Sequence, residues 1–250
     1  MMQKSMTGFI LIDKPTGITS FDVIARLRRL TGVKRIGHAG TLDPFATGLL
    51  IVAIGREATR EMSKFVGLDK TYEATFVLGA TSTTDDVTGK LSEPISTSHL
   101  TEQQVKEVLE SFVGELDQVP PTYAAIKVQG KKLYELARAG TPTLVEPRRV
   151  TLYSIENLSE WVPLPAGRHG TRGTPTSTLH IRIHCSSGTY IRSIARDLGA
   201  KLRIGGYVSE LRRTSIGLFA ISEAFTLEEL NSNNIENNLI KIDSFIGRLT

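Results

Sequence analysis

Residues 37–54 read GHAGTLDPFATGLLIVAI, and the interpretation of the fold starts from this stretch. Its last six residues are all apolar, which is typical of a short buried strand. The twelve residues before them include three glycines, which let a backbone turn tightly or approach a ligand closely. Asp43 lies among them and precedes Pro44, which biases Asp43 towards an extended or turn conformation. The stretch predicts a glycine-rich loop, residues 37–48, that holds one carboxylate before a strand.

Asp43 has two explanations that these residues leave open. A carboxylate held in a rigid loop could take part in catalysis. It could also accept the hydrogen bonds of a turn, which is the commoner role of an aspartate beside proline and glycine.

Strands and helices are interspersed on both sides of this loop. Apolar or alternating runs predict strands at residues 8–13, 70–78, 123–128, 148–155 and 178–185. Helical apolar spacing and capping residues predict helices at residues 20–30, 101–113, 131–139 and 190–202, the first with Ser20 as its N-cap. Because there is no strict β-α-β rhythm, the pattern favours a mixed α+β fold over a doubly wound one. Residues 158–177 are expected to form a mobile loop between two strands.

Two histidines, His180 and His184, invite a metal-site interpretation that their spacing opposes. In a strand, positions four residues apart are separated by roughly 13 Å, too far for two ligands of one ion. The alternation predicts instead that one face of this strand is buried and that His180, Arg182 and His184 point outward. We expect no metal site.

Composition bounds the class of protein. The chain has 250 residues, 40% of them hydrophobic, enough for one large domain or two small ones. Cys185 is its single cysteine, which rules out an internal disulfide and suits a reducing compartment. No apolar run approaches the roughly 18 residues of a membrane span, and no signal peptide is recognisable. These features predict a soluble cytoplasmic protein.

Charge is distributed unevenly along the chain. Residues 1–60 hold nine Lys or Arg against four acids, and residues 181–220 hold seven against two. Residues 85–118 are acidic, with eight carboxylates against two lysines. The two basic segments could form one surface for an anionic ligand such as RNA or DNA, or could be ordinary solvated faces. Charge alone does not decide between these.

Several common motifs are absent from the sequence. It contains no P-loop, no Gly-x-Ser-x-Gly nucleophile elbow and no dinucleotide fingerprint. Nucleotide-dependent enzymes and serine hydrolases of the usual kinds therefore lose their support.

The glycine-rich loop and four further blocks resemble the bacterial tRNA pseudouridine synthase B family. In the loop the resemblance is carried by Gly40-Thr41-Leu42-Asp43-Pro44 and Ala46-Thr47-Gly48. The other blocks follow in family order: Asp69-Lys70-Thr71-Tyr72, residues 120–138, Cys185-Ser186-Ser187-Gly188-Thr189-Tyr190-Ile191-Arg192-Ser193 and Leu211-Arg212-Arg213-Thr214. The resemblance covers roughly residues 8–219.

This resemblance implies a fold and an activity. The fold would be the pseudouridine-synthase type, a mixed, largely antiparallel sheet flanked by helices and loops, with an active-site cleft across the sheet. The activity would be isomerisation of the T-loop uridine of tRNA (position 55) to pseudouridine. Because the product has the same composition as the substrate, no cofactor is expected.

The resemblance also implies roles for six residues. Asp43 would be the nucleophile, attacking either the base or the sugar, and Arg192 its cationic partner. Tyr72 would stack on the target base and could move a proton. As substrate-binding residues, Tyr190 and Leu211 would line the uracil pocket, although Tyr190 could equally be a core residue and Leu211 is expected to pack in either case. His38 would fill the space left by a flipped-out base.

Further expectations concern partners and domains. The partner would be tRNA, bound through its T arm by a monomer, with no membrane and no metal. Lys14 and the arginines of the first helix would contact phosphates. Residues 1–220 would form the catalytic domain. Residues 221–250 would be a short C-terminal extension, with five acids against two bases and no full PUA-type domain.

Two other functions remain as alternatives. One is a catalytically silent RNA-binding or RNA-folding protein of the same fold. The other is a carboxylate-dependent hydrolase of nucleosides or sugars, which would need a second carboxylate beside Asp43, and Asp86 is the candidate.

Overall fold

The computed structural model describes residues 6–249, apart from residues 125, 129, 142, 144, 160, 161 and 165–175. The chain forms two compact units. Unit 1 comprises Met1–Tyr72 and Leu211–Thr250, and unit 2 comprises Glu73–Glu210. Two strands, β4 (Lys70–Leu78) and β11 (Gly206–Ile216), begin in one unit and end in the other.

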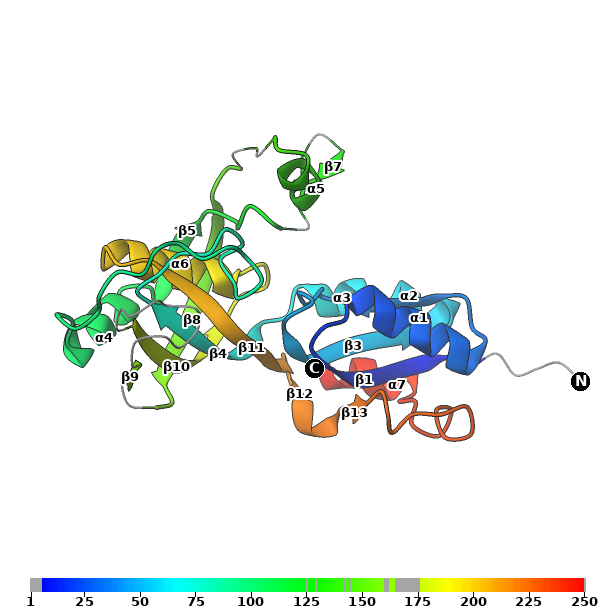
Figure 1. Cartoon of the computed structure of the whole chain (residues 1–250). Helices are drawn as coiled ribbons and strands as arrows, with labels where there is room; N and C mark the ends of the chain where they lie inside the picture. The colour runs from blue at the N-terminus through cyan, green and yellow to red at the C-terminus, as the bar shows by residue number, and fades with distance from the viewer. Residues whose placement is uncertain are drawn as a thin grey trace, which may run out of the picture. The chain divides into compact units, whose positions relative to one another are not determined.

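Unit 1 is built on an antiparallel pair of strands (Figure 1). β1 (Gly8–Lys14) and β3 (Thr47–Ile54) pair along their whole length, from Gly8 opposite Ile54 to Lys14 opposite Gly48. β2 (Ile36–Ala39) pairs antiparallel with β3, whereas β13 (Phe225–Thr226) runs parallel to β1. The end of β11 runs parallel to β3 and pairs antiparallel with β12 (Phe219–Ala220).

Helix α1 (Ser20–Thr31) covers one face of this pair and short helices cover the other. Val23, Ile24 and Leu27 of α1 are buried against β1 and β3, together with apolar residues of the C-terminal segment. The other face carries α2 (Arg56–Arg60), α3 (Ser63–Val66) and α7 (Ile242–Ile246), and Figure 1 shows α1 and α7 on different sides of β1. The short 3-10 helices η2 (Ile221–Glu223) and η3 (Gly247–Leu249) complete this unit.

In unit 2 the strand order is β11, β4, β10, β8, β5, and β11 contributes its first residues to this unit. β10 (Thr176–Cys185) pairs antiparallel with β8 (Arg148–Asn157) and with β9 (Val162–Leu164), and β8 pairs antiparallel with β5 (Gly114–Gln118). Helices α4 (Glu102–Glu110) and α6 (Ile191–Lys201) belong to this unit. A small hairpin of β6 (Lys127–Val128) and β7 (Lys131–Lys132) leads into α5 (Leu133–Arg138).

Most predicted elements are confirmed, and the strand at residues 70–78 has the predicted ends. In β10 the predicted face is buried, and the side chains of His180, Arg182 and His184 keep solvent exposure. The prediction of Ser20 as the N-cap of α1 is wrong, because the N-cap is Thr19. The Thr19 side chain accepts from the Asp22 amide, and the Asp22 carboxylate accepts from the Thr19 amide.

Three predictions of local structure need correction. The loop predicted at residues 37–48 is shorter than expected, because its first residues belong to β2. His38 therefore lies on a strand. The strand at 123–128 is reduced to β6, because Ala124 and Ile126 pack in a small apolar cluster with Leu133. The helix at 131–139 begins later, after β7. Most of the expected loop at 158–177 lies outside the described residues.

Candidate active site

The loop that carries Asp43 is fastened to the start of α1. The Ser20 hydroxyl accepts from the Leu42 amide at 3.0 Å and donates to the Leu42 carbonyl at 3.3 Å. The Gly17 amide donates to the Pro44 carbonyl at 2.8 Å. Asp43 itself is half-buried, and its carbonyl accepts from the Ala46 amide. The side chain of Asp43 is therefore presented from a backbone that is held on both sides.

Lys14 lies beside this loop as a buried cation. Its side chain is fully enclosed and donates to the carbonyls of Pro15 and Ile18 at 2.8 Å and of Pro44 at 3.4 Å. Burial lowers the pKa of Lys14 to about 8, while the charge of Asp43 opposes that shift. The expectation that Lys14 contacts phosphates is therefore wrong, because its ammonium group is already occupied by carbonyls.

His38 is partly buried on β2. Burial lowers the pKa of its imidazole, and the charge of Arg213 lowers it further. Both effects favour the uncharged form of the imidazole.

Tyr72 and Leu211 lie on neighbouring strands of unit 1. Tyr72 is on β4, on the same side as Ala74, and Leu211 begins the unit 1 part of β11; both are buried. Thr214 donates to the Thr71 carbonyl at 3.3 Å, which ties the two strands together. The two side chains therefore come from strands that this hydrogen bond joins.

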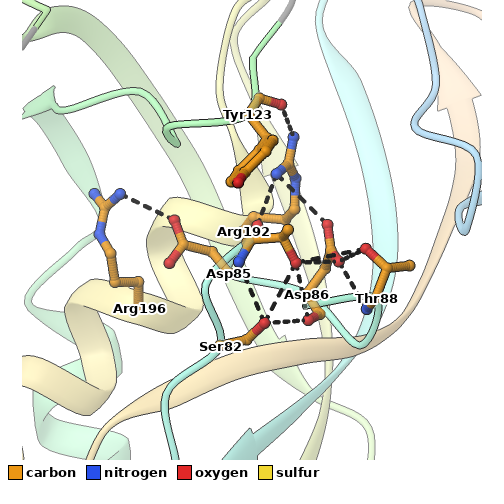
Figure 2. Close-up of polar contacts among 8 residues, drawn as sticks. Ser82, Asp85, Asp86, Thr88, Tyr123, Arg192 and Arg196 are labelled. Carbon is orange, nitrogen blue, oxygen red and sulfur yellow. Dashed lines mark hydrogen bonds and ion pairs between the residues drawn. The ribbon is translucent and has the colours of Figure 1, made fainter. Parts of the chain in front are cut away.

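Arg192 is buried in the first turn of α6, with 3% of its side chain exposed. Its guanidinium donates to the carbonyls of Thr84 at 2.8 Å and Tyr123 at 3.1 Å, and lies 3.5 Å from the carboxylate of Asp86 (Figure 2). A cation in the first turn of a helix is opposed by the helix dipole, so these acceptors offset an unfavourable position. Arg192 is therefore not a surface charge.

Asp86 is held as tightly as the arginine. Its carboxylate accepts from the Thr84 hydroxyl at 2.7 Å and from the Thr88 amide and hydroxyl at 2.9 and 2.5 Å. Sequence analysis considered Asp86 only as a second catalytic carboxylate and missed its role as the counter-ion of Arg192. Threonines on both sides of an aspartate are a turn signal, but nothing local indicates which cation the aspartate binds.

A second arginine of α6, Arg196, binds the turn that contains Asp85 and Asp86. Arg196 pairs with Asp85 at 3.2 Å, and Asp85 adopts a left-handed backbone conformation with φ 59° (Figure 2). Burial raises the pKa of Asp85, and the charges of Arg196 and Arg192 oppose that shift. Arg192 and Arg196 therefore hold two successive carboxylates from one helix face.

Tyr190 immediately precedes α6 and is fixed through its backbone. The buried side-chain amide of Gln118 accepts from the Tyr190 amide at 2.7 Å and donates to the Tyr190 carbonyl at 3.1 Å. The Tyr190 ring packs against the cluster of Ala124, Ile126 and Leu133. Gln118 is a second positioning residue that sequence analysis missed.

The six predicted site residues are divided between the units. Unit 1 holds His38, Asp43, Tyr72 and Leu211, and unit 2 holds Tyr190 and Arg192. The pairing of Arg192 with Asp43 stays a prediction. In the part of the chain that the structure describes, no three His, Cys, Asp or Glu side chains converge as a metal site. No helix in that part is long and apolar enough to cross a bilayer.

Comparison with known families identifies the chain. The family model described as TruB family pseudouridylate synthase (N terminal domain) matches residues 28–191. The chain belongs to the TruB family of pseudouridylate synthases. A second model, described as the tRNA pseudouridylate synthase B C-terminal domain, matches residues 192–246. The predicted family and isomerase class are thereby confirmed.

Individual relatives agree with the family match. The chain is 45% identical to a tRNA pseudouridine synthase B of Corynebacterium jeikeium, over 92% of this chain and 72% of the relative. It is 43% identical to one of Leifsonia xyli, over 90% of this chain and 72% of the relative. For one of Thermobifida fusca the identity is 44%, over 89% and 74%.

Solved structures confirm the predicted fold of this TruB family member. A chain from the crystal structure of a Cbf5-Nop10-Gar1 complex matches with a TM-score of 0.64 and 29% identity, over 90% of this chain and 54% of that chain. A chain of an H/ACA RNP bound to a substrate RNA containing 2'-deoxyuridine matches with 0.62 and 27%, over 90% and 53%. This chain spans about half the length of both. The mixed sheet, largely antiparallel and flanked by helices, is therefore the family fold.

Proposed function

We propose that this chain isomerises the T-loop uridine of tRNA, at position 55, to pseudouridine, with Asp43 as the nucleophile. The observation that carries the proposal is the placement of Asp43, which sits in a fastened loop and within electrostatic range of a buried lysine. The relatives named tRNA pseudouridine synthase B support tRNA as the substrate. The proposal includes binding of the T arm by a monomeric enzyme in the cytoplasm.

The reaction defines what the site must supply. The N1–C1′ bond of the uridine breaks, a C5–C1′ bond forms, the proton leaves C5 and N1 ends protonated. Atoms and electrons balance without an external reagent. Asp43 would attack the base or the sugar as an ionised carboxylate, and a nearby cation favours that ionised form.

The remaining predicted residues take the other roles. Arg192 would pair with the Asp43 carboxylate, for which a planar guanidinium is suited. Tyr72 would stack on the base and move the C5 proton, while Tyr190 and Leu211 would line the uracil pocket. His38 would fill the space that the flipped base leaves, and burial favours the uncharged form of its ring.

The variant Asp43→Asn tests the proposal. Asparagine caps turns about as well as aspartate but has no anionic oxygen to attack with. The variant should fold with an almost unchanged melting temperature, bind tRNA and form no pseudouridine at enzyme excess over long incubation. Asp22→Asn is the matched control, because Asp22 is a capping aspartate of the same unit. It should keep full activity.

Two results would contradict the proposal. Isomerisation by Asp43→Asn well above background, with host enzyme excluded, would remove Asp43 as the nucleophile. Tight tRNA binding by the wild-type chain without any pseudouridine, mapped base by base, would favour the silent RNA-binding alternative. The hydrolase alternative needed Asp86 as a second catalytic carboxylate. The Asp86 carboxylate is instead bound by Thr84, Thr88 and Arg192.

A further inference from the structure

Arg213, on β11, is one of the largest fully buried side chains of the protein, with 1% exposed. Its Nε donates to the Leu49 carbonyl at 2.8 Å, and its Nη2 donates to the Gly40 carbonyl at 2.9 Å. Gly40 lies just before, and Leu49 just after, the eight residues that contain Asp43. One guanidinium therefore bridges both ends of the loop.

The backbone of Arg213 holds the same loop a second time. Arg213 is the parallel partner of Gly48 in the β11–β3 pairing. A Cβ built on Gly48 would lie 2.3 Å from the Arg213 carbonyl oxygen, so the two backbones are in direct contact. A Cβ on Gly40 would lie 3.3 Å from Arg213 Nη1. The glycines at both ends of the loop thus leave room for this arginine.

The charge of Arg213 needs a counter-charge. Within the described residues, its hydrogen bonds go to carbonyls and no carboxylate is ion-paired with it. Burying a guanidinium without a paired anion is costly. The charges of Arg213 and Asp43 shift the pKa of Lys14 in opposite directions: Arg213 lowers it and Asp43 raises it. Two buried cations therefore lie within electrostatic range of each other, and Asp43 is an anion within range of Lys14.

We propose that Arg213 is a positioning residue, which fixes both ends of the loop carrying Asp43 and, with Lys14, balances the charge of its carboxylate. This inference rests on the proposed role of Asp43. It adds to that role a reason for the carboxylate to stay ionised and for the loop to stay in one conformation during the reaction.

Three variants separate this role from simple packing. Arg213→Lys keeps the charge but lacks the planar fork whose Nε and Nη2 donate to the two carbonyls, and Arg213→Met fills similar space without charge. Arg212→Lys is the matched control. Arg212 is the neighbour of Arg213 on β11, and it forms a half-exposed ion pair with Asp13 that a lysine can retain. Single-turnover rates should fall in the order wild type, Arg213→Lys, Arg213→Met, while tRNA affinity stays within a factor of about two of wild type.

We expect Arg213→Met to lose about 10- to 100-fold in rate, the equivalent of one or two hydrogen bonds to a charged group. Arg212→Lys should remain near wild type. A residue that only filled space would tolerate methionine better than lysine, because an uncompensated ammonium group is costly to bury. A rate for Arg213→Met equal to or above that of Arg213→Lys would overturn the proposal.

A stability measurement tests the charge balance independently of activity. Arg213→Met should lower the melting temperature of the wild-type chain more than it lowers that of Asp43→Asn, where the anion is already absent. Equal losses in the two backgrounds would overturn the balancing role. Where Arg213→Met does not fold, Arg213→Gln takes its place in both measurements. Inactive Asp43→Asn beside fully active Arg213 variants would refute this inference and leave the proposed function standing.

Discussion

Replacing Lys14 with methionine should remove a rise in stability that the wild-type chain shows at alkaline pH. The ammonium group is fully enclosed, and burial lowers its pKa from 10.5 to about 8. Between these two values the unfolded chain still holds the proton, whereas the folded chain has released it. Raising the pH through this window therefore stabilises the fold, and below pH 8 the whole cost of the buried charge is present.

The size of the effect follows from the two pKa values. A difference of 10.5 against about 8 corresponds to about 3 kcal/mol over the full window. Between pH 7 and pH 9.5 the gain is at most about 2 kcal/mol, because the unfolded lysine is only partly deprotonated at the upper end. For a chain of this size that corresponds to about 4–8 °C in melting temperature.

Thermal melting at pH 7, 8, 9 and 9.5 measures this difference in the wild-type chain and in Lys14→Met. The series stops below pH 10 because of Tyr207, whose pKa is raised by burial in the folded chain. At higher pH this tyrosine would lose its proton in the unfolded chain first, which would lower the stability of the fold. Lys64→Met is the control, because Lys64 is half-exposed in an ion pair with Glu61. Effects common to all three chains cancel in the comparison.

Parallel curves for the wild-type chain and Lys14→Met would refute this reasoning. They would mean that the Lys14 charge is solvated or fully balanced in the folded state. The constant offset between such parallel curves would then report only the effect of methionine on packing. The expected result is a gap between the two curves that changes steadily from pH 8 upward.

Two other changes test the site. Arg192→Lys should reduce the single-turnover rate by about 100-fold or more, since lysine lacks the planar fork, whereas Arg149→Lys on the exposed part of β8 should have little effect. Near wild-type rates for Arg192→Lys would remove Arg192 from the proposed mechanism. Arg29→Glu on the exposed side of α1 should weaken tRNA binding and leave single-turnover chemistry nearly unchanged. It should also lower the slope of log affinity against log salt concentration by about one or two. An unchanged slope would mean that α1 does not face RNA.

The local elements could be predicted because their signals are local. The alternation from Lys70 to Leu78 marks β4 with its correct ends, and the same period sorts the two faces of β10. The start of α1 was placed one residue late, although Thr19 and Asp22 carry the spacing of a capping box. The strand expected at 123–128 failed because its apolar residues pack in a small cluster, a possibility that a period of two does not exclude.

The candidate site was predicted by motif and not by physics. A glycine-rich loop with one aspartate is equally compatible with a turn, and the motif order selected Asp43, Tyr72 and Arg192 together. The same motifs could not identify Asp86 or Gln118 as the residues that hold Arg192 and Tyr190 in place. Their partners are distant in the sequence, and no local pattern records such a pair.

The family, the positions of most strands and helices, and the residues proposed for the chemistry follow from the sequence alone. The folded structure was needed to show that carbonyls enclose Lys14, that Arg192 is buried against Asp86, and that Arg213 reaches Gly40 from 173 residues away. The physical reason is that a charged residue is expected at the surface because its burial is costly. The acceptors that make burial tolerable come from other segments, and they exist only once the chain has folded.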